Sequence, residues 1–334
     1  MAAQTNTEGG VPFYKIGTIG GKADAYISKD LFDEYKMKYS FPHKGEVMIT
    51  CAGTVGKCII YNGEDSYYQD SNIVWIDNPN EIISNDFLYH LLSKINWSHL
   101  NSTTIVRIYN DDLRNLKLYY PHHDEQKKIT HLFQLINERI ATQNKIIEKY
   151  KSLIKGLRVC CMQRVYGNNV HLSEIAQIYQ PQTISSTELT EDGFLVYGAN
   201  GIIGKYKDYN HETEQICITC RGNTCGMVNY TKPMSWITGN AMVINTDKYQ
   251  DKVYKRYLYH YLSAYNFNSI ISGSGQPQIV RTPLEKLKIT LPTISEQKQK
   301  AMILDKIQNK IDTNHKELNL YVRQKQYLLR QMFI

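Results

Sequence analysis

The chain repeats its own pattern after 171 residues, and this repeat limits what it can fold into more than any other feature. The first copy reads Leu116-Lys117-Leu118, Pro121 and Glu125-Gln126-Lys127, and the second reads Leu287-Lys288-Ile289, Pro292 and Glu296-Gln297-Lys298. A long stretch of helical periodicity follows each copy. An internal repeat of this size indicates a tandem of one structural unit, here a globular domain followed by a long helix.

Both helical stretches carry side chains at heptad spacing that would form a packing seam, in the same phase of the repeat. In the first stretch we predict the seam residues Phe133, Ile136, Ile140, Gln143, Ile147, Tyr150, Ile154 and Leu157. In the second we predict Leu304, Ile307, Ile311, Asn314, Leu318, Tyr321, Leu328 and Met332. The polar seam residues Gln143 and Asn314 also coincide after the shift, and a buried amide fixes the register of paired helices.

The length of these helices indicates how they pack. Each is expected to run for about 40 residues, which at a rise of 1.5 Å per residue is roughly 55–60 Å. A helix of this length cannot pack wholly against a small domain. We therefore predict that the two helices form an antiparallel coiled coil with one domain at each end, a ruler with pseudo-twofold symmetry.

The segments before the helices read mainly as β-structure, with a strand near residues 45–51 and another near 215–220, each followed by a glycine-punctuated turn. The prediction is an α+β fold with a first domain at residues 1–123, a helix at 124–166, a second domain at 167–294 and a helix at 295–334. The second domain has a strand-like segment at 171–176 without a counterpart in the first. We expect the first domain to be shortened at its N-terminus or completed by another segment.

Composition and charge exclude some classes of protein. The net charge of +7 permits nucleic-acid binding without requiring it. No apolar run approaches the roughly 20 residues that span a bilayer, and residues 1–10 lack the pattern of a secretory signal. Seven cysteines without the spacing of a small disulfide scaffold favour reduced thiols. We therefore predict a cytoplasmic protein with no membrane partner.

A metal site and an active site are the rival interpretations. Cys217, Cys220 and Cys225, with His211 nearby, could suggest zinc. The strand pattern instead makes these cysteines small apolar residues, so we predict no metal. No nucleophile–base constellation or methyltransferase motif stands out, so we predict a chain without catalytic residues.

Taken in order, these motifs resemble the specificity subunit of type I restriction–modification systems. The family pattern joins an I-T/S-x-x-G-x-x-G strand and turn, a G-S-x-Q-x-x-I loop, an L-x-x-I-x-x-P strand, and a proline followed by E-Q at the start of a long helix. The second copy matches at Ile218, Thr219, Gly222, Gly226, Gly273, Ser274, Gln276, Ile279, Leu284, Leu287, Ile289, Pro292, Glu296 and Gln297. The first matches at Ile49, Thr50, Gly53, Gly56, Ile108, Leu113, Leu116, Leu118, Pro121, Glu125 and Gln126. It departs from the family in its loop, at Ser102-Thr103-Thr104.

The resemblance implies a DNA-recognition role without catalysis. Two target-recognition domains would each read one half of a gapped site on double-stranded DNA, and the helix pair would set the gap, as the spacing of symmetric dimers does on DNA. The implied partners are two adenine methyltransferase subunits and, in complexes that also restrict, motor-nuclease subunits. S-adenosylmethionine and ATP would be bound by those partners, and this chain would carry no cofactor.

Reading a DNA sequence requires side chains that reach base edges. Arginine pairs with guanine, and asparagine or glutamine with adenine, whereas phosphate contacts only position the protein. Our candidate DNA-binding residues lie on predicted loops: Arg221, Asn223, Gln276, Gln278 and Arg281 in the second domain, and Lys57 and Arg107 in the first.

Two alternatives remain open. A two-headed coiled-coil scaffold that binds proteins would explain the seam but not the duplicated loops. A non-productive decoy, which binds methyltransferase subunits without recognising DNA, is suggested by the shortened first domain.

Overall fold

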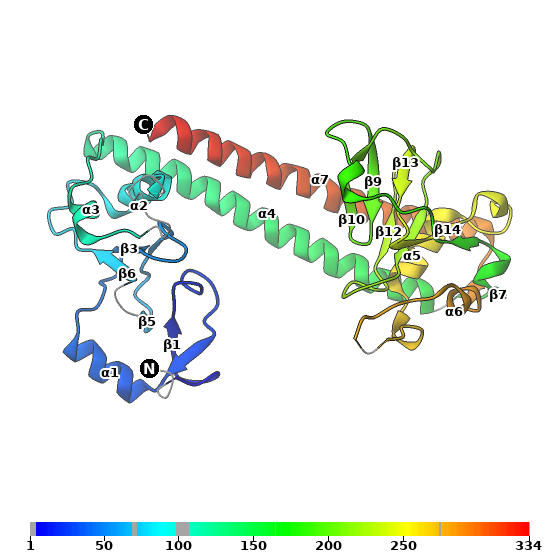
Figure 1. Cartoon of the computed structure of the whole chain (residues 1–334), viewed down its shortest axis with the longest axis horizontal. Coiled ribbons are helices and arrows are strands. Elements are labelled where there is room, and N and C mark those ends of the chain that lie inside the picture. The colour runs from blue at the N-terminus through cyan, green and yellow to red at the C-terminus, as the bar shows by residue number, and fades with distance from the viewer. Residues whose placement is uncertain (1–4, 69–71, 98–106, 164, 274, 334) are drawn as a thin grey trace. The chain divides into compact units, whose positions relative to one another are not determined.

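The computed structural model describes residues 5–68, 72–97, 107–163, 165–273 and 275–333 of the chain. The chain forms two compact units: unit 1 consists of Met1–Gln143 with Glu317–Ile334, and unit 2 of Asn144–Lys316. Two long helices, α4 (His123–Gln163) and α7 (Ile294–Met332), contribute to both units. Figure 1 draws α4 in green and α7 in orange to red. The predicted domain bounds had kept each helix separate from the globular parts.

The described residues of unit 1 form two small sheets. Its strands are β1 (Val11–Tyr14), β2 (Ala25–Ile27), β3 (Val47–Thr50), β4 (Cys58–Ile60), β5 (Tyr67–Tyr68) and β6 (Ile73–Ile76), and its short helices are α1 (Lys29–Lys38), α2 (Asn85–Lys94) and α3 (Asn110–Arg114). One sheet has the strand order β2-β1-β5, and the other has the order β4-β3-β6.

Among the residues that the structure describes, unit 2 has more strands than unit 1. Its strands are β7 (Asn168–His171), β8 (Gln177–Tyr179), β9 (Phe194–Gly198), β10 (Gly201–Tyr206), β11 (Ile216–Thr219), β12 (Val228–Tyr230), β13 (Ser235–Ile237), β14 (Ala241–Asn245) and β15 (Lys288–Leu291). Its short helices are η3 (Leu172–Glu174), η4 (Ser186–Glu188), η5 (Asp247–Tyr249), α5 (Lys255–Ala264), η6 (Phe267–Ser269) and α6 (Arg281–Glu285). Its sheets have the orders β10-β9-β13, β12-β11-β14-β8 and β15-β7.

The two units repeat one plan. The sheet β2-β1-β5 corresponds to the sheet β10-β9-β13. In each sheet, the strand that comes first in the sequence pairs in parallel with the strand that comes last, β1 with β5 and β9 with β13. The central strands β3 and β11 are buried throughout. In β11, Ile216 and Ile218 pack with α5, whereas Cys217 packs with the sheet of β9 and β13. A strand covered on both faces reads as a continuous apolar run, which explains the sequence at residues 216–218, and the predicted α+β class is confirmed.

Within each unit, the segments of α4 and α7 run antiparallel. In unit 1, Arg139 donates to the Tyr321 hydroxyl at 3.2 Å and Gln143 donates to Glu317 at 3.0 Å. In unit 2, Ile154 packs with Leu304 and Ile311. All sixteen predicted seam side chains, from Phe133 to Leu157 and from Leu304 to Met332, are buried or partly buried.

A buried glutamine fixes each globular part to the start of a long helix. In unit 1, the Gln126 side chain accepts from the Ser84 amide at 2.8 Å and donates to the carbonyls of Ile82 and Pro121. In unit 2, Gln297 accepts from the Tyr254 amide at 2.8 Å and donates to two carbonyls in the same way. These are the glutamines of the repeated Glu-Gln motif, and Ser84 and Tyr254 cap helices α2 and α5. The motif therefore holds the first turn of each packing helix.

The last glycine of each strand–turn motif lies under an aromatic ring. Gly56 has a φ of +82°, and a Cβ at this position would meet the Trp97 ring at 2.1 Å. Gly226 has a φ of +90° and lies against Phe267. The positive φ favours glycine at both positions, and at Gly56 the ring also leaves no room for a Cβ.

Candidate nucleic-acid interface

Three loops of unit 2 meet at one end of the sheets. The turn after β11 pairs with the loop before α6, because the Gly222 amide donates to the Pro277 carbonyl at 2.9 Å and residues Arg221 and Gln278 form an isolated bridge. The β9–β10 hairpin joins them through a hydrogen bond between the Thr224 hydroxyl and Asn200. Residues far apart in the sequence are thereby brought to one surface.

Four of the five candidates in unit 2 lie on these loops with exposed side chains, namely Arg221, Asn223, Gln276 and Gln278. Arginine, asparagine and glutamine offer the donors and acceptors that read guanine and adenine edges. The structure brings these four residues together, and DNA contact by each of them stays a prediction.

Arg281 lies at the start of α6, where its guanidinium pairs with Glu285 at 2.6 Å and keeps 61% of its side-chain surface. An exposed ion pair of this kind is weak. A phosphate or a base could therefore replace Glu285 at little cost.

The candidates in unit 1 are placed differently. Arg107 precedes Ile108, whose amide donates to the Cys51 carbonyl at 2.9 Å, just as Gln278 precedes Ile279, whose amide donates to Cys220 at 3.0 Å. Arg107 therefore occupies the position of Gln278, and its guanidinium lies 5.7 Å from the centre of the Tyr109 ring. The divergent loop at residues 102–104 lies outside the described residues.

Lys57 is partly engaged within unit 1. Its ammonium donates to the Ile19 carbonyl at 2.5 Å. It corresponds to Met227 of unit 2, because the carbonyls of Lys57 and Met227 accept from the amides of Thr50 and Thr219. An ammonium has three N–H donors and Lys57 is exposed, so a contact with DNA would not require it to leave this carbonyl. Of the two candidates in unit 1, Arg107 is the one whose counterpart in unit 2, Gln278, is itself a candidate.

Exposed apolar side chains beside the unit 2 loops escaped the sequence reasoning. Ile202 and Ile203 on β10 are 55% and 51% exposed, and Met227 is 48% exposed. Apolar contacts to the thymine methyl group contribute to base readout. The sequence Gly-Ile-Ile-Gly at residues 201–204 was a usable signal, since glycines mark turns and turns lie at the protein surface.

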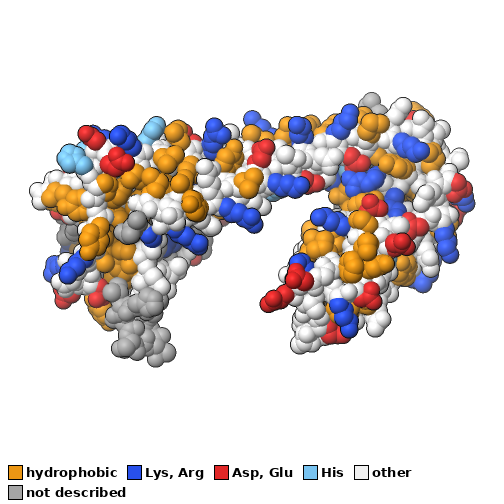
Figure 2. All heavy atoms as spheres, turned by 90° about the horizontal axis from the view of Figure 1, so that it is seen from above, with side chains coloured by type: hydrophobic (Ala, Val, Ile, Leu, Met, Phe, Trp, Pro, Cys, Tyr) orange, Lys and Arg blue, Asp and Glu red, His pale blue; other side chains and the backbone are white. Residues whose placement is uncertain are grey.

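One face of the molecule carries charges of both signs. On the face shown in Figure 2, Lys and Arg side chains are interspersed with Asp, Glu and apolar side chains. A mixed surface fits a protein whose DNA contacts are confined to particular loops better than one that binds through its overall charge.

Cys217 in β11 and Cys220 directly after β11 face different cores. Cys217 packs with Tyr197 and Ile237, whereas Cys220 packs in the core beneath α5. Burial raises the pKa of the Cys217 thiol, so it stays protonated. In the described part of the chain, no group of three or more His, Cys, Asp or Glu side chains is placed to hold a metal ion.

A cluster of ionisable groups at the junction of unit 2 with its helices was also missed. Asp305 of α7 accepts from His260 at 2.9 Å and from Arg256. Burial alone would raise the pKa of Asp305, but the hydrogen bonds from His260 and Arg256 outweigh burial and lower it. The Arg256 guanidinium also lies 4.3 Å from the centre of the Tyr230 ring, and burial raises the pKa of Tyr230 to about 12. This cluster attaches the globular part of unit 2 to α7, and its residues are not part of the three loops that carry the candidate DNA-binding side chains.

No described helix is long and apolar enough to cross a membrane.

Known proteins share this sequence pattern. The family described as "Type I restriction modification DNA specificity domain" matches residues 2–151 and again residues 168–320. A Haemophilus influenzae protein named as a type I restriction enzyme specificity subunit is 51% identical over 126 residues, or 38% of this chain and 33% of that protein. The EcoprrI specificity subunit of Escherichia coli is 32% identical over 147 residues, or 42% of this chain and 36% of that protein. The matches span about a third of the length of each relative.

Solved structures share the fold. The S subunit of a type I restriction–modification system from M. genitalium superposes with a TM-score of 0.63 at 17% identity, covering 100% of this chain and 91% of that one. A chain from a structural study of complex assembly in a type I R-M system gives a TM-score of 0.59 at 14% identity, covering 98% and 92%. At these identities the likeness supports the fold alone. With two copies of the family domain over most of its length, this chain belongs to the type I restriction–modification DNA specificity family.

Proposed function

We propose that the chain is the DNA sequence-recognition subunit of a type I restriction–modification complex. Each unit reads one half of a gapped site, and the chain performs no catalysis of its own. It works in the cytoplasm and recruits two methyltransferase subunits that carry S-adenosylmethionine. In complexes that also restrict, it further recruits ATP-driven motor-nuclease subunits.

One observation carries this proposal. In each unit the carbonyl of the residue that follows the buried central strand accepts an equivalent hydrogen bond, from Ile108 to Cys51 in unit 1 and from Ile279 to Cys220 in unit 2. The candidate residue just before the donating amide differs, being Arg107 in unit 1 and Gln278 in unit 2, although the two hydrogen bonds are equivalent. Two equivalent frames with different polar side chains suit the reading of two different half-sites.

Single-molecule sequencing of methylated bases would test the proposal. The chain would be co-expressed with the methyltransferase of its own system in a host without other adenine methylation. A gapped motif with one methyladenine in each half is the expected result. A symmetric motif built from a single half-site would instead mean that unit 1 is silent and that two chains pair.

Variants separate base reading from positioning. Arg221→Ala should weaken DNA binding by about 1–3 kcal/mol and relax only the half-site read by unit 2, if Arg221 contacts a base. Uniform weakening across sequences would mean a phosphate contact. Lys232→Ala, which lies off these loops, serves as the control and should leave the motif unchanged.

The two alternatives give different results. A protein-binding scaffold would show no DNA affinity that falls steeply with added salt. A decoy would form a stable complex with the methyltransferase and yield no methylation.

A further inference from the structure

A polar hollow in unit 2 lies beside the turn that carries two of the candidate DNA-binding residues. It has a volume of about 420 Å³, and its lining residues come from α4, from residues 225–228, and from α5 with the segment that follows it. All of them lie within the described ranges 107–163 and 165–273. Cys225 and Gly226, which follow Asn223 in the same turn, form part of its wall, so the hollow borders the candidate interface.

Arg158 of α4 supplies the positive charge of this hollow. Among the described lining residues, Arg158 alone is charged. Its Nε donates to Nδ1 of His260 at 3.2 Å, and a terminal nitrogen lies 3.5 Å from the side-chain oxygen of Gln308. The guanidinium carbon lies 5.5 Å from the centre of the Tyr259 ring. A guanidinium has five N–H donors, so these contacts hold the group in place and leave donors for a ligand.

The partners of Arg158 are neutral groups. Within the described ranges, Arg158 forms no ion pair with an Asp or Glu side chain. The carboxylate of the neighbouring cluster, Asp305, pairs with Arg256 and with Nε2 of His260. Burial lowers the pKa of His260, so at neutral pH its ring accepts from Arg158 as a neutral group. A partly buried guanidinium with neutral partners favours an anionic ligand, because hydrogen bonds between charged groups are the strong ones.

Two asparagines add donors to the same hollow. Asn266 and Asn268 are exposed and belong to the segment after α5. The side-chain oxygen of Asn266 accepts from the Asn268 amide at 3.0 Å, so its NH2 group is what it can offer a ligand. Arginine and asparagine side chains both contact phosphate oxygens in DNA complexes. A hollow with one guanidinium and two amides, and with no carboxylate among its described lining residues, therefore suits phosphate better than a cation or an apolar group.

The described residues of unit 1 line an equivalent hollow of about 470 Å³. Its lining residues occupy matching positions of the repeat, namely Gly56, Lys57, Ser93, Asn96 and Trp97 against Gly226, Met227, Ser263, Asn266 and Phe267. The cation comes from a different element, since Lys57 lies in the turn before β4 whereas Arg158 lies on α4. The same hollow with a cation from another position points to a common need for positive charge. Residues 98–106, which follow Trp97, lie outside the described residues.

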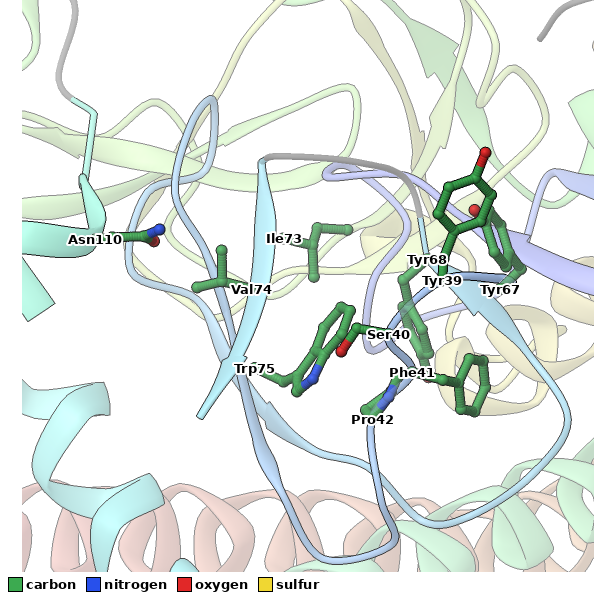
Figure 3. Close-up of a pocket in the computed structure, with 10 residues that line it drawn as sticks. All are labelled: Tyr39, Ser40, Phe41, Pro42, Tyr67, Tyr68, Ile73, Val74, Trp75 and Asn110. Carbon is green, nitrogen blue, oxygen red and sulfur yellow. The ribbon is translucent and has the colours of Figure 1, made fainter. Parts of the chain in front are cut away.

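An aromatic cavity of unit 1 differs from these two hollows. Figure 3 shows this cavity, which has a volume of about 470 Å³ and is lined by the rings of Tyr39, Phe41, Tyr67, Tyr68 and Trp75 among other side chains. No Lys or Arg side chain occurs among its described lining residues. The positive charge of the hollows beside the strand–turn motifs therefore does not follow simply from the basic composition of the chain.

We propose that the hollow of unit 2, the Arg158 pocket, binds a backbone phosphate of the DNA next to the half-site that unit 2 reads. The Arg158 guanidinium and the amides of Asn266 and Asn268 donate to the phosphate oxygens. This role rests on the proposed function, and it separates two tasks within unit 2. Phosphate contacts fix the position of a protein on the duplex without reading sequence, so the Arg158 pocket positions the loops whose side chains read the bases.

Methylphosphonate linkages, which remove the charge of one backbone phosphate at a time, test the proposal on the complex of this chain with its methyltransferase. With a duplex that carries the mapped target site, one linkage beside the half-site of unit 2 should weaken binding about tenfold. In Arg158→Gln the same linkage should have less than a twofold effect, because the contact is already lost. In Asn268→Asp it should have no effect or strengthen binding, because the new carboxylate repels a charged phosphate.

The choice of variants keeps charge and folding under control. Asn268→Asp changes an exposed side chain, so it tests the pocket even if Arg158→Gln disturbs the contact with His260. Lys248→Gln removes the same amount of charge at an exposed position after β14, at the end of the sheet away from the loops, and should leave the linkage effect unchanged. Arg158→Gln should also reduce the slope of log K against log salt by about one, with the methylated motif unchanged.

The possible failures are distinguishable. If the wild-type complex binds no DNA, the proposed function fails together with the phosphate contact. If it binds DNA and every linkage keeps its effect in both pocket variants, only the phosphate contact is wrong. An altered motif in these variants would mean base reading, and lost methyltransferase binding would mean an acidic segment of that partner. Weaker binding of inorganic phosphate to Arg158→Gln with unchanged DNA binding would assign the pocket to a small phosphate compound and overturn the proposal.

Discussion

A histidine at the same position of the repeat is buried in two different ways. His90 of unit 1 packs among aromatic rings, 4.7 Å from Phe133 and 5.5 Å from Phe333 between ring centres. His260 of unit 2 is hydrogen-bonded to Asp305 at 2.9 Å and to Arg158 at 3.2 Å. The junction between globular part and helix is therefore aromatic in unit 1 and ionic in unit 2. The same backbone arrangement is therefore compatible with an aromatic or an ionic junction, provided that each buried group has a suitable partner.

Breaking the aromatic junction should have the largest effect. Phe133 is fully buried, so Phe133→Ala should destabilise unit 1 by about 3–5 kcal/mol through lost burial and a residual cavity. Hydrogen exchange of α2 amides should accelerate accordingly, while α5 amides in unit 2 keep their rates. Equal acceleration in both helices would show that the two junctions are not independent.

Lowering the pH should destabilise the two units to different extents because their buried histidines differ. Burial, with a smaller contribution from Lys325, lowers the pKa of His90 to about 4, from a usual value near 6.5. The unfolded chain therefore takes up a proton at this position before the folded chain does. The contribution of His90 to the stability of unit 1 should be constant above about pH 6.5 and fall by on the order of 3 kcal/mol as the pH drops toward 4. His90→Gln should flatten this part of a denaturation series.

The acid loss at His260 should be smaller than at His90. Burial lowers the pKa of His260 as well, but its hydrogen bond to Asp305 opposes that shift. If lowering the pH accelerated amide exchange in α5 as much as in α2, the expected difference between the two histidines would be wrong.

Breaking the ionic junction should reduce stability less than breaking the aromatic junction does. Asp305→Ala removes the partner of Arg256 and His260, and because the Asp305 side chain is 23% exposed we expect a loss of about 2 kcal/mol in unit 2 rather than the full cost of a buried charge. The loss should grow at low ionic strength, unlike that of Phe133→Ala. Asp65→Ala, at an exposed pair with Lys29, is the control and should leave the free energy of unfolding nearly unchanged.

Replacing the glutamine at the start of each long helix should have the smallest effect on stability, and this effect should be similar in the two units. Gln126→Ala and Gln297→Ala each remove three hydrogen bonds and leave buried backbone groups without partners, which should cost about 1–2 kcal/mol per variant. Thermal unfolding of the two variants side by side measures this. Losses that differ by more than about twofold would mean that the glutamines are not equivalent.

The pattern of the long helices could be predicted because it depends on local periodicity. Seam positions follow from a heptad count, and side chains such as Phe133 and Leu304 are buried as that count requires. Helix α1 was missed, although the sequence carries its signals, since Ser28 caps it and Asp30 lies in its first turn.

The candidate site could be predicted only in part, because its geometry depends on distant segments. Arg221 and Gln278 were chosen separately by residue type, and nothing in the sequence pairs them as the structure does. Lys57 binds the carbonyl of Ile19, a residue far away in the sequence. Likewise, the residue that completes the aromatic junction, Phe333, lies more than 240 residues from His90.

The glycines beneath Trp97 and Phe267 limit what resemblance can reveal. Gly56 and Gly226 are among the residues that make the family recognisable, yet both are favoured by an internal requirement: a positive φ at each, and at Gly56 also the close Trp97 ring. A chain that reads any DNA sequence with this architecture needs the same two residues. The motifs that identify such proteins therefore carry no information about the DNA sequence they recognise. Two members that recognise different DNA sequences could share every recognisable motif.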